Sequence, residues 1–155
     1  MTKVLQLMTK KLITVGPLDS VEEAVTLLRQ RNVRHLLVMQ KARLVGIMSD
    51  RDVKRVLDPA QTKKRVMAIG GLYFLLEPIL VEEIMTRDPV TVPPSASVHE
   101  AAELMLKHRF GALPVVRGTR PVGIITETDL LRHYAAQVEP DEAGHRRPRK
   151  SRARK

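Results

Sequence analysis

The 155-residue sequence contains no cysteine and no tryptophan, and aromatic residues make up only 3% of it. Without cysteine, the chain has no disulfide, no thiolate nucleophile and no thiolate metal ligand. Few aromatic rings also leave little material for the stacking platforms on which single-stranded nucleic acids bind. These absences exclude thiol chemistry and argue against a module that binds single strands.

Long apolar runs and catalytic loop motifs are missing as well. No apolar stretch approaches the roughly 18 residues that cross a bilayer, and the amino terminus lacks the apolar core of a secretory signal. No Gly-x-Ser-x-Gly elbow, Walker loop or dinucleotide-binding glycine pattern occurs. With 43% apolar residues, the chain can nonetheless fold around a core. We therefore expect a folded, cytoplasmic protein that has no membrane contact and is not an enzyme.

Positive charge is concentrated at the carboxyl end. The formal net charge is +10, and the segment 146–155 carries seven positive charges and no negative one, which leaves +3 for the rest of the chain. We expect residues 139–155 to form a disordered basic arm. Two interpretations stay open for it, a solubilising extension and weak contact with nucleic acid or another acidic surface.

An internal repeat occupies most of the remaining chain. Residues 4–52 align with residues 81–129 without a gap, and 18 of the 49 aligned pairs are identical. Chance would supply about three identities at ordinary amino-acid frequencies. The chain therefore contains a duplicated unit of about 50 residues.

In each unit the spacing of apolar residues and the turn signals predict the order strand, helix, strand, strand, helix. In the first unit we expect a strand at 12–15, a helix over about 20–31, strands near 34–39 and 43–48, and a helix from Asp50. An apolar helical stripe recurs in both units, as Val21, Ala24, Val25 and Leu28 and as Val98, Ala101, Ala102 and Met105.

One such unit is too small to bury both faces of its sheet, so two units should pack together. We therefore predict an α/β (α+β) fold in which repeats 1–58 and 81–138 pack about an approximate twofold axis. A groove should lie between them, with the starts of the second helices facing it. Residues 59–80 have no counterpart in the repeat, and we expect them to form a packed helical linker. Alternatively, Tyr73–Leu76 could form a contact surface for another subunit.

The repeats close with the motifs GIMSDRD (46–52) and GIITETD (123–129). Locally, Ser49 with Asp52 and Thr126 with Asp129 fit a capping box at a helix start, and this interpretation needs no ligand. Two further capping boxes begin at Ser20 and Ser97, and the acidic residue three positions later is glutamate in both. The different acid weakly suggests a second task for the two aspartates.

These motifs, together with VRHLLV (33–38) and FGALPVV (110–116), resemble the CBS (cystathionine-β-synthase) domain family over residues 4–135. Pairs of such domains form a regulatory ligand-binding unit, the Bateman module, so the resemblance implies a sensor and a homodimer. Among its members, the chain looks like the bacterial acetoin-utilisation type without the extra carboxyl-terminal domain which that type often has.

The resemblance also implies ligand sites for adenosine compounds, namely AMP, ADP, ATP or S-adenosylmethionine, with magnesium only where a polyphosphate binds. The closing aspartate would accept hydrogen bonds from the ribose hydroxyls, and the helix start would favour a phosphate. Matched position by position, the first site comprises Asp52, Ser49, Arg51, His35 and Arg34, with Val90 from the other repeat. The second site comprises Asp129, Thr126, Thr128, Ala112 and Gly111, with Ile13 from the other repeat.

We expect the two sites to differ in charge. Two arginines and a histidine would let the Asp52 site prefer a phosphorylated adenosine. The Asp129 site would be neutral apart from its acid, and it would take a less charged adenosyl compound or stay empty. His35 could instead be an ordinary core histidine, and His99 with Glu103 reads as a solvated helix face ahead of a metal half-site.

The sequence is compatible with three functional classes. The first is a sensor in which an adenosine ligand in the groove biases the packing of the repeats or of two subunits, which a partner detects. The second is a nucleic-acid-associated regulator that uses the basic arm, with a salt-dependent interaction. The third is catalytic turnover of a bound nucleotide, for which the sequence offers no nucleophile motif.

Overall fold

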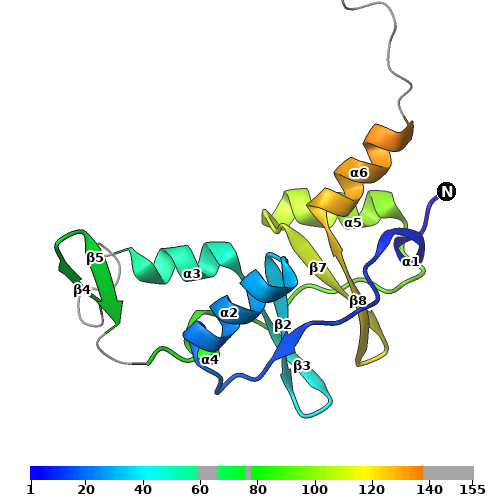
Figure 1. The fold of residues 1–155 in the computed structure, drawn as a ribbon. Coiled ribbons are helices and arrows are strands. Elements are labelled where there is room, and N and C mark those ends of the chain that lie inside the picture. Colours follow the sequence, from blue (N-terminus) through cyan, green and yellow to red (C-terminus); the bar gives the residue numbers. More distant parts are fainter. Residues whose placement is uncertain (59–65, 76–77, 138–155) are drawn as a thin grey trace, which may run out of the picture.

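Figure 1 shows the computed structural model of the chain, which describes residues 1–58, 66–75 and 78–137, with the backbone alone at 66–68 and 73–75. The first repeat contains β1 (Thr14–Val15), α2 (Val21–Arg31), β2 (His35–Gln40), β3 (Arg43–Ser49) and α3 (Asp50–Leu57). The second contains α5 (Val98–His108), β7 (Ala112–Arg117), β8 (Arg120–Thr126) and α6 (Glu127–Gln137). The predicted fold class is confirmed, and so is the order of elements in the first repeat. In the second repeat the expected opening strand is only an isolated bridge between Val92 and Val115.

The helices form where the capping boxes and apolar stripes predict them. At the start of α2, the Ser20 hydroxyl accepts from the Glu23 N–H while the Glu23 carboxylate accepts from the Ser20 N–H, and α5 begins in the same way at Ser97. Val21, Ala24 and Leu28 are buried, as are Ala101 and Met105 in the second repeat. Each helix therefore has one side packed into a core.

The opening segments of the two repeats are exchanged, as the expected positions of Val90 and Ile13 imply, and the exchange extends into the two cores. The short helix α1 (Val4–Leu7) precedes the first repeat, yet Val4 is fully buried in the core of the second. The short helix α4 (Val81–Ile84) precedes the second repeat, yet Val81 is fully buried in the core of the first. Figure 1 shows α1 near α5 and α6, and α4 below α2. Each core therefore needs residues from both repeats.

Backbone pairing follows the same exchange. Strand β6 (Thr86–Arg87) joins the first repeat's sheet beside β3, giving the order β1-β2-β3-β6. At the equivalent place in the second repeat, Thr9 pairs with Ile124. The hydrogen bond from the Val81 N–H to the Asp19 carbonyl has its counterpart in the bond from the Val4 N–H to the Ala96 carbonyl, each 2.9 Å long. Equivalent contacts 77 residues apart establish the approximate twofold axis.

The glycine of each closing motif is needed for this exchange. A Cβ atom at Gly46 would lie 2.5 Å from the Met85 Sδ, and a Cβ atom at Gly123 would lie 2.8 Å from the Met8 Sδ. The backbone carbonyls of Thr86 and Thr9 approach to 3.0 and 2.9 Å of these positions. The opening segment of one repeat therefore packs directly on the closing motif of the other.

The predicted linker helix is wrong for the part of the linker that the structure describes. Strands β4 (Val66–Ile69) and β5 (Leu72–Leu75) pair in an antiparallel hairpin. Its turn residues Gly70 and Gly71 both have positive φ, +57° and +80°, which glycine adopts without strain and which a tight two-residue hairpin turn requires. A Gly-Gly pair between two apolar runs thus outweighs the tendency of those runs to continue a helix.

Two further expectations concern residues outside this description. The contact surface expected at Tyr73–Leu76 rests on side chains that are not described, and the basic arm at 139–155 lies beyond the last described residue. Within residues 1–58, 66–75 and 78–137, none of the helices has the length and apolarity needed to cross a membrane.

Candidate functional site: two pockets between the repeats

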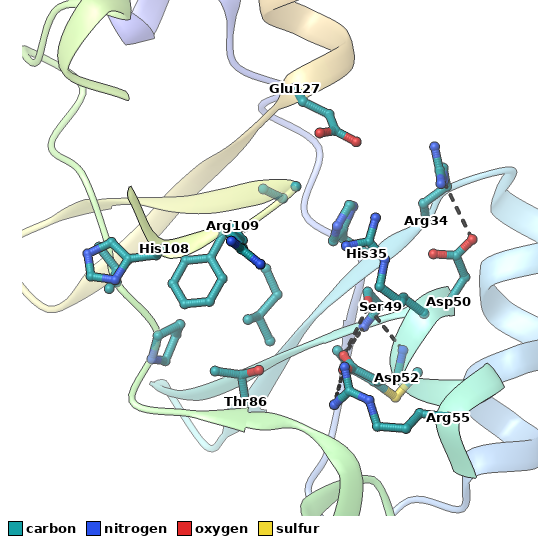
Figure 2. A pocket seen from close by; sticks show the side chains of 18 residues that line it. Arg34, His35, Ser49, Asp50, Asp52, Arg55, Thr86, His108, Arg109 and Glu127 are labelled. Atoms are coloured by element: carbon teal, nitrogen blue, oxygen red, sulfur yellow. Dashed lines mark hydrogen bonds and ion pairs between the residues drawn. The ribbon is translucent and has the colours of Figure 1, made fainter. Parts of the chain in front are cut away.

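The first pocket, of about 340 Å³, lies at the amino end of α3 (Figure 2). All six residues that the sequence predicts for the first site line it: Arg34, His35, Ser49, Arg51, Asp52 and Val90. Strand β2 supplies His35, the β3–α3 junction supplies Ser49 and Asp52, and the opening segment of the second repeat supplies Val90. The exchange of opening segments therefore completes this pocket.

The two oxygens of the Asp52 carboxylate have different surroundings. Oδ2 accepts hydrogen bonds from the Ser49 backbone N–H at 2.8 Å and from the Ser49 hydroxyl at 3.0 Å, which closes the capping box. Oδ1 lies 3.8 Å from the Arg55 Nη1 and accepts no hydrogen bond among the described residues. The cap thus occupies one oxygen and leaves the other for a donor in the pocket.

Helix α3 offers fewer backbone donors than an isolated helix start would. The Asp50 N–H donates to the Arg34 carbonyl, and the Asp52 N–H donates to the Ser49 hydroxyl. Of the first three helical residues, only Arg51 keeps an N–H with no partner in the described part of the chain. An anion at this helix end would therefore depend mainly on side-chain cations.

Four arginines supply those cations: Arg34, Arg51, Arg55 and Arg109. The Arg34 Nε lies 3.5 Å from the Asp50 Oδ2, and the side chain is 63% exposed, so this ion pair is weak and the guanidinium can turn to a ligand. Figure 2 shows Arg109 across the pocket from Arg55. Three carboxylates, those of Asp50, Asp52 and Glu127, also line the pocket, which leaves an excess of one positive charge.

His35 lies between these charges and is half-buried. Burial is the main influence on its pKa and lowers it below the ordinary 6.5. Asp50 opposes this shift, Arg34 adds to it, and Glu127 and Asp52 oppose it. The lowered pKa favours the neutral form of the ring, so we do not count His35 among the cations of the pocket.

The second pocket, of about 320 Å³, is the twofold counterpart of the first and lies at the amino end of α6. It is lined by five of the six residues that the sequence predicts for the second site: Ile13, Gly111, Thr126, Thr128 and Asp129. Ala112 is the exception, because its side chain is buried and lines the first pocket.

Asp129 repeats the arrangement of Asp52. Its Oδ2 accepts from the Thr126 N–H and from the Thr126 hydroxyl, both at 2.9 Å, and its Oδ1 lies 3.6 Å from the Arg132 Nη1. The two aspartate side chains are 13% and 11% exposed. Both repeats therefore hold one carboxylate oxygen toward a pocket in the same way.

The expectation that the second site is neutral apart from its acid is wrong. Lys11, Arg34 and Arg132 line it with the carboxylates of Glu127 and Asp129, so it also has an excess of one positive charge. Lys11 comes from the exchanged opening segment, and Arg34 comes from the other repeat. Transferring a motif position by position within one repeat could not reveal either residue.

Arg109 and Phe110 are pocket residues that the sequence analysis missed. Arg109 ends α5 in the left-handed region at φ +58°, which costs energy for a residue with a Cβ, and its counterpart Asn32 ends α2 at φ +51°. Asparagine is the usual choice at such a position, so an arginine there was the available signal. The Phe110 ring stacks on His108 at 5.4 Å and adds an aromatic wall.

The pair formed by His99 and Glu103 is confirmed as a solvated helix-face contact. Their atoms Nε2 and Oε1 lie 3.3 Å apart, and the side chains are 77% and 67% exposed. Among the residues described, no group of three or more histidine, cysteine, aspartate or glutamate side chains could hold a metal ion.

The CBS domain family model matches the chain twice, at residues 4–59 and 81–136. The chain belongs to the CBS domain family. The CBS domain-containing protein YhcV of Bacillus subtilis is 30% identical over 144 residues, a match that covers 93% of this chain and 91% of YhcV. An inosine-5′-monophosphate dehydrogenase of Korarchaeum cryptofilum is 35% identical over 123 residues, but the match spans only 22% of that enzyme.

Solved CBS structures share the fold of this CBS pair. The CBS domain pair of protein MJ0100, in complex with 5′-methylthioadenosine and S-adenosyl-L-methionine, has a TM-score of 0.75 and 28% identity, with 89% of this chain and 99% of that chain covered. CBSX2 in complex with AMP has a TM-score of 0.69 and 29% identity, covering 88% and 98%. A Vibrio cholerae structure described as an acetoin utilization protein (AcuB) has a TM-score of 0.70 and 28% identity, covering 88% and 93%.

Proposed function

We propose that this CBS pair is a non-catalytic sensor of adenosine-containing ligands, which bind in the two pockets between its repeats. The observation that carries the proposal is that each pocket joins the closing aspartate of one repeat to the opening segment of the other. A ligand in either pocket would therefore touch both repeats and stabilise their packing. Occupancy could then be transmitted to a second subunit of a homodimer or to a partner protein.

In the proposed complex, the aspartate Oδ1 accepts hydrogen bonds from the ribose, because Oδ2 is already engaged in the helix cap. In the first pocket, the adenine base would lie against the apolar side chains of Val90, Ile47 and Phe110. A phosphate would face the arginines around α3. The complexes of the related CBS pairs with AMP and with S-adenosyl-L-methionine support an adenosine ligand.

The ligand class differs between the pockets in this proposal. Four arginines line the first pocket, against two arginines and one lysine in the second. Position 51 is an arginine in the first helix start, and the equivalent position 128 is a threonine in the second. We therefore assign AMP, ADP or ATP to the Asp52 pocket, with Mg²⁺ only for a polyphosphate, and a less charged adenosyl compound to the Asp129 pocket.

Isothermal calorimetry tests this proposal with AMP, ATP and S-adenosylmethionine. Asp52→Asn and Asp129→Asn are the informative variants, because an asparagine oxygen can still accept the capping bond while the charge is lost. AMP should lose affinity by about tenfold or more in Asp52→Asn, as expected for a lost charged hydrogen bond. The Asp129→Asn variant is the matched control for the first pocket. If none of the three ligands binds the wild type below millimolar concentration, the two aspartates are helix caps only.

The basic arm offers a second role that the same sample can test. Binding of duplex DNA that falls steeply with salt, and that disappears on deletion after Gly144, would assign nucleic-acid contact to the arm. AMP binding should survive this deletion, since the residues of both pockets precede position 138.

A further inference from the structure

The two pockets share one wall. Arg34, His35, Gly111 and Glu127 line both pockets, two of them from each repeat. Figure 2 shows Arg34, His35 and Glu127 along one side of the first pocket. A ligand group that enters either pocket to this depth therefore meets the same side chains.

The wall is thin because Gly111 has no side chain. A Cβ atom at Gly111 would lie 3.3 Å from the His35 Nε2 and 3.5 Å from the Glu127 Oε1. The imidazole of one repeat and the carboxylate of the other thus both lie beside the position that a side chain at residue 111 would occupy. No second layer of side chains is needed to separate the pockets at this point.

The charges of the wall are not symmetric. In the first repeat, Arg34 pairs with Asp50, the first residue of α3. In the second repeat, the equivalent acid is Glu127, but the position equivalent to Arg34 is Gly111, so the repeat supplies no arginine of its own. Glu127 is exposed and makes no ion pair or side-chain hydrogen bond within the described residues. One arginine therefore serves two pockets, beside a carboxylate that repels anions from both.

We propose that the two pockets bind anionic ligands antagonistically. An anion in one pocket takes the shared Arg34 guanidinium and adds negative charge beside Glu127, so a second anion binds more weakly in the other pocket. An uncharged adenosine ligand uses the ribose and base contacts without this competition. The filled state of the module is then one phosphorylated ligand together with one uncharged or cationic adenosyl ligand. This inference rests on the proposed function, since it needs both pockets to accept adenosine compounds.

Calorimetry with AMP and adenosine tests the antagonism through a binding cycle. Asp129→Asn and Asp52→Asn weaken one pocket each, so they give the affinity of the Asp52 pocket and of the Asp129 pocket alone. If the pockets are independent, the overall association constant for filling both pockets of the wild type equals the product of the association constants measured for each pocket alone. With AMP we expect the overall association constant to be at least about fivefold smaller than this product, which is within the usual range of coupling between sites. With adenosine we expect agreement within about twofold, the scatter of such products.

Two further variants distinguish the shared arginine from a local one. Arg34→Gly copies the residue of the second repeat, and it should weaken AMP in both pockets. Arg132→Ala is the control, because Arg132 lines only the second pocket and its loss should weaken AMP there alone. A wild type that takes two molecules of adenosine but one of AMP would be the extreme form of the predicted result.

Two outcomes would overturn the antagonism, and they are distinguishable. If AMP fills both pockets with the product expected for independence, the pockets are uncoupled, although the proposed function stands. If neither AMP nor adenosine binds the folded wild type, the proposed function fails, and the antagonism fails with it.

Discussion

Arg34 and Gly111 occupy equivalent positions in the two repeats, and both line both pockets. Arg34 adds one cation to the lining of each pocket, while a Cβ atom at Gly111 would lie 3.3 Å from the His35 Nε2 and 3.5 Å from the Glu127 Oε1. A duplicated unit has therefore become asymmetric at the place where its copies meet. Both pockets have the same excess of one positive charge, and they share the single cation of Arg34.

Arg109→Asn should separate phosphate binding from folding. Asparagine occupies the equivalent position, Asn32, and tolerates the left-handed backbone, so the free energy of unfolding should not decrease. AMP affinity in the Asp52 pocket should fall about fivefold to tenfold, because a charge-assisted contact contributes about 1.5–3 kcal/mol before partial compensation by the other arginines. Adenosine affinity should stay the same. An unchanged AMP affinity in calorimetry would remove Arg109 from the phosphate contacts.

The pH dependence of stability should report on His35. Its pKa is lowered in the folded protein, so the unfolded chain binds more protons as the pH falls through 6.5, and the free energy of unfolding should decrease. His35→Ala copies Ala112 of the second repeat and should remove this part of the acid sensitivity. Urea unfolding at pH 7.5 and 5.5 measures the difference. His99→Ala is the control, since that side chain is 77% exposed. If the wild type and His35→Ala lose equal stability between pH 7.5 and 5.5, His35 is not a source of the acid sensitivity.

Gly123→Ala should destabilise the protein by about 1–3 kcal/mol, the usual cost of overpacking. The added Cβ would lie 2.9 Å from the Thr9 carbonyl oxygen, a backbone atom that cannot move alone. Gly16→Ala is the matched control, because the nearest atom to its Cβ would be the Asp19 Oδ2 at 3.5 Å, an ordinary contact distance. This substitution should change the free energy of unfolding by less than about 0.5 kcal/mol. Equal unfolding midpoints for the two variants would show that Met8 and Thr9 do not pack on the closing motif.

Val81→Ala tests the exchange of opening segments. Val81 is fully buried in the first repeat's core, so the substitution should cost about 2 kcal/mol for the lost methyl groups and the cavity. Hydrogen exchange should become faster in α2, β2 and β3, although position 81 belongs to the second repeat. Val4→Ala is the mirror experiment and should affect α5, β7 and β8. Faster exchange confined to the mutated repeat's own elements would argue against the exchange.

Local features of the fold could be predicted from the sequence because they depend on neighbouring residues. Ser20 with Glu23 fixes the start of a helix, and the apolar stripe from Val21 to Leu28 fixes its buried face. Because the second unit repeats this pattern, the same predictions apply to it. The hairpin at Gly70-Gly71 also depends on a local turn signal, but the apolar residues on either side of it are compatible with a helix as well as with strands.

Long-range features could not be predicted in this way. Val4 and Lys11 belong to the first repeat by sequence, and only the folded chain places them in the second repeat's core and pocket. The six residues expected around the first pocket do line it: five belong to the motifs at 33–38 and 46–52, and the family resemblance supplied Val90 from the other repeat. The shared wall depends on the packing of two copies, which no property of one copy specifies.

The proposed ribose contacts of Asp52 and Asp129 can be tested by changing the ligand, because the protein then stays intact. We would titrate the wild type with AMP and with 2′,3′-dideoxy-AMP under the same conditions. The account predicts that removing both hydroxyls weakens binding by about tenfold or more, as expected when hydrogen bonds to a charged group are lost. Equal affinity for the two nucleotides, or no binding of AMP, would contradict the account and leave the two aspartates as helix caps.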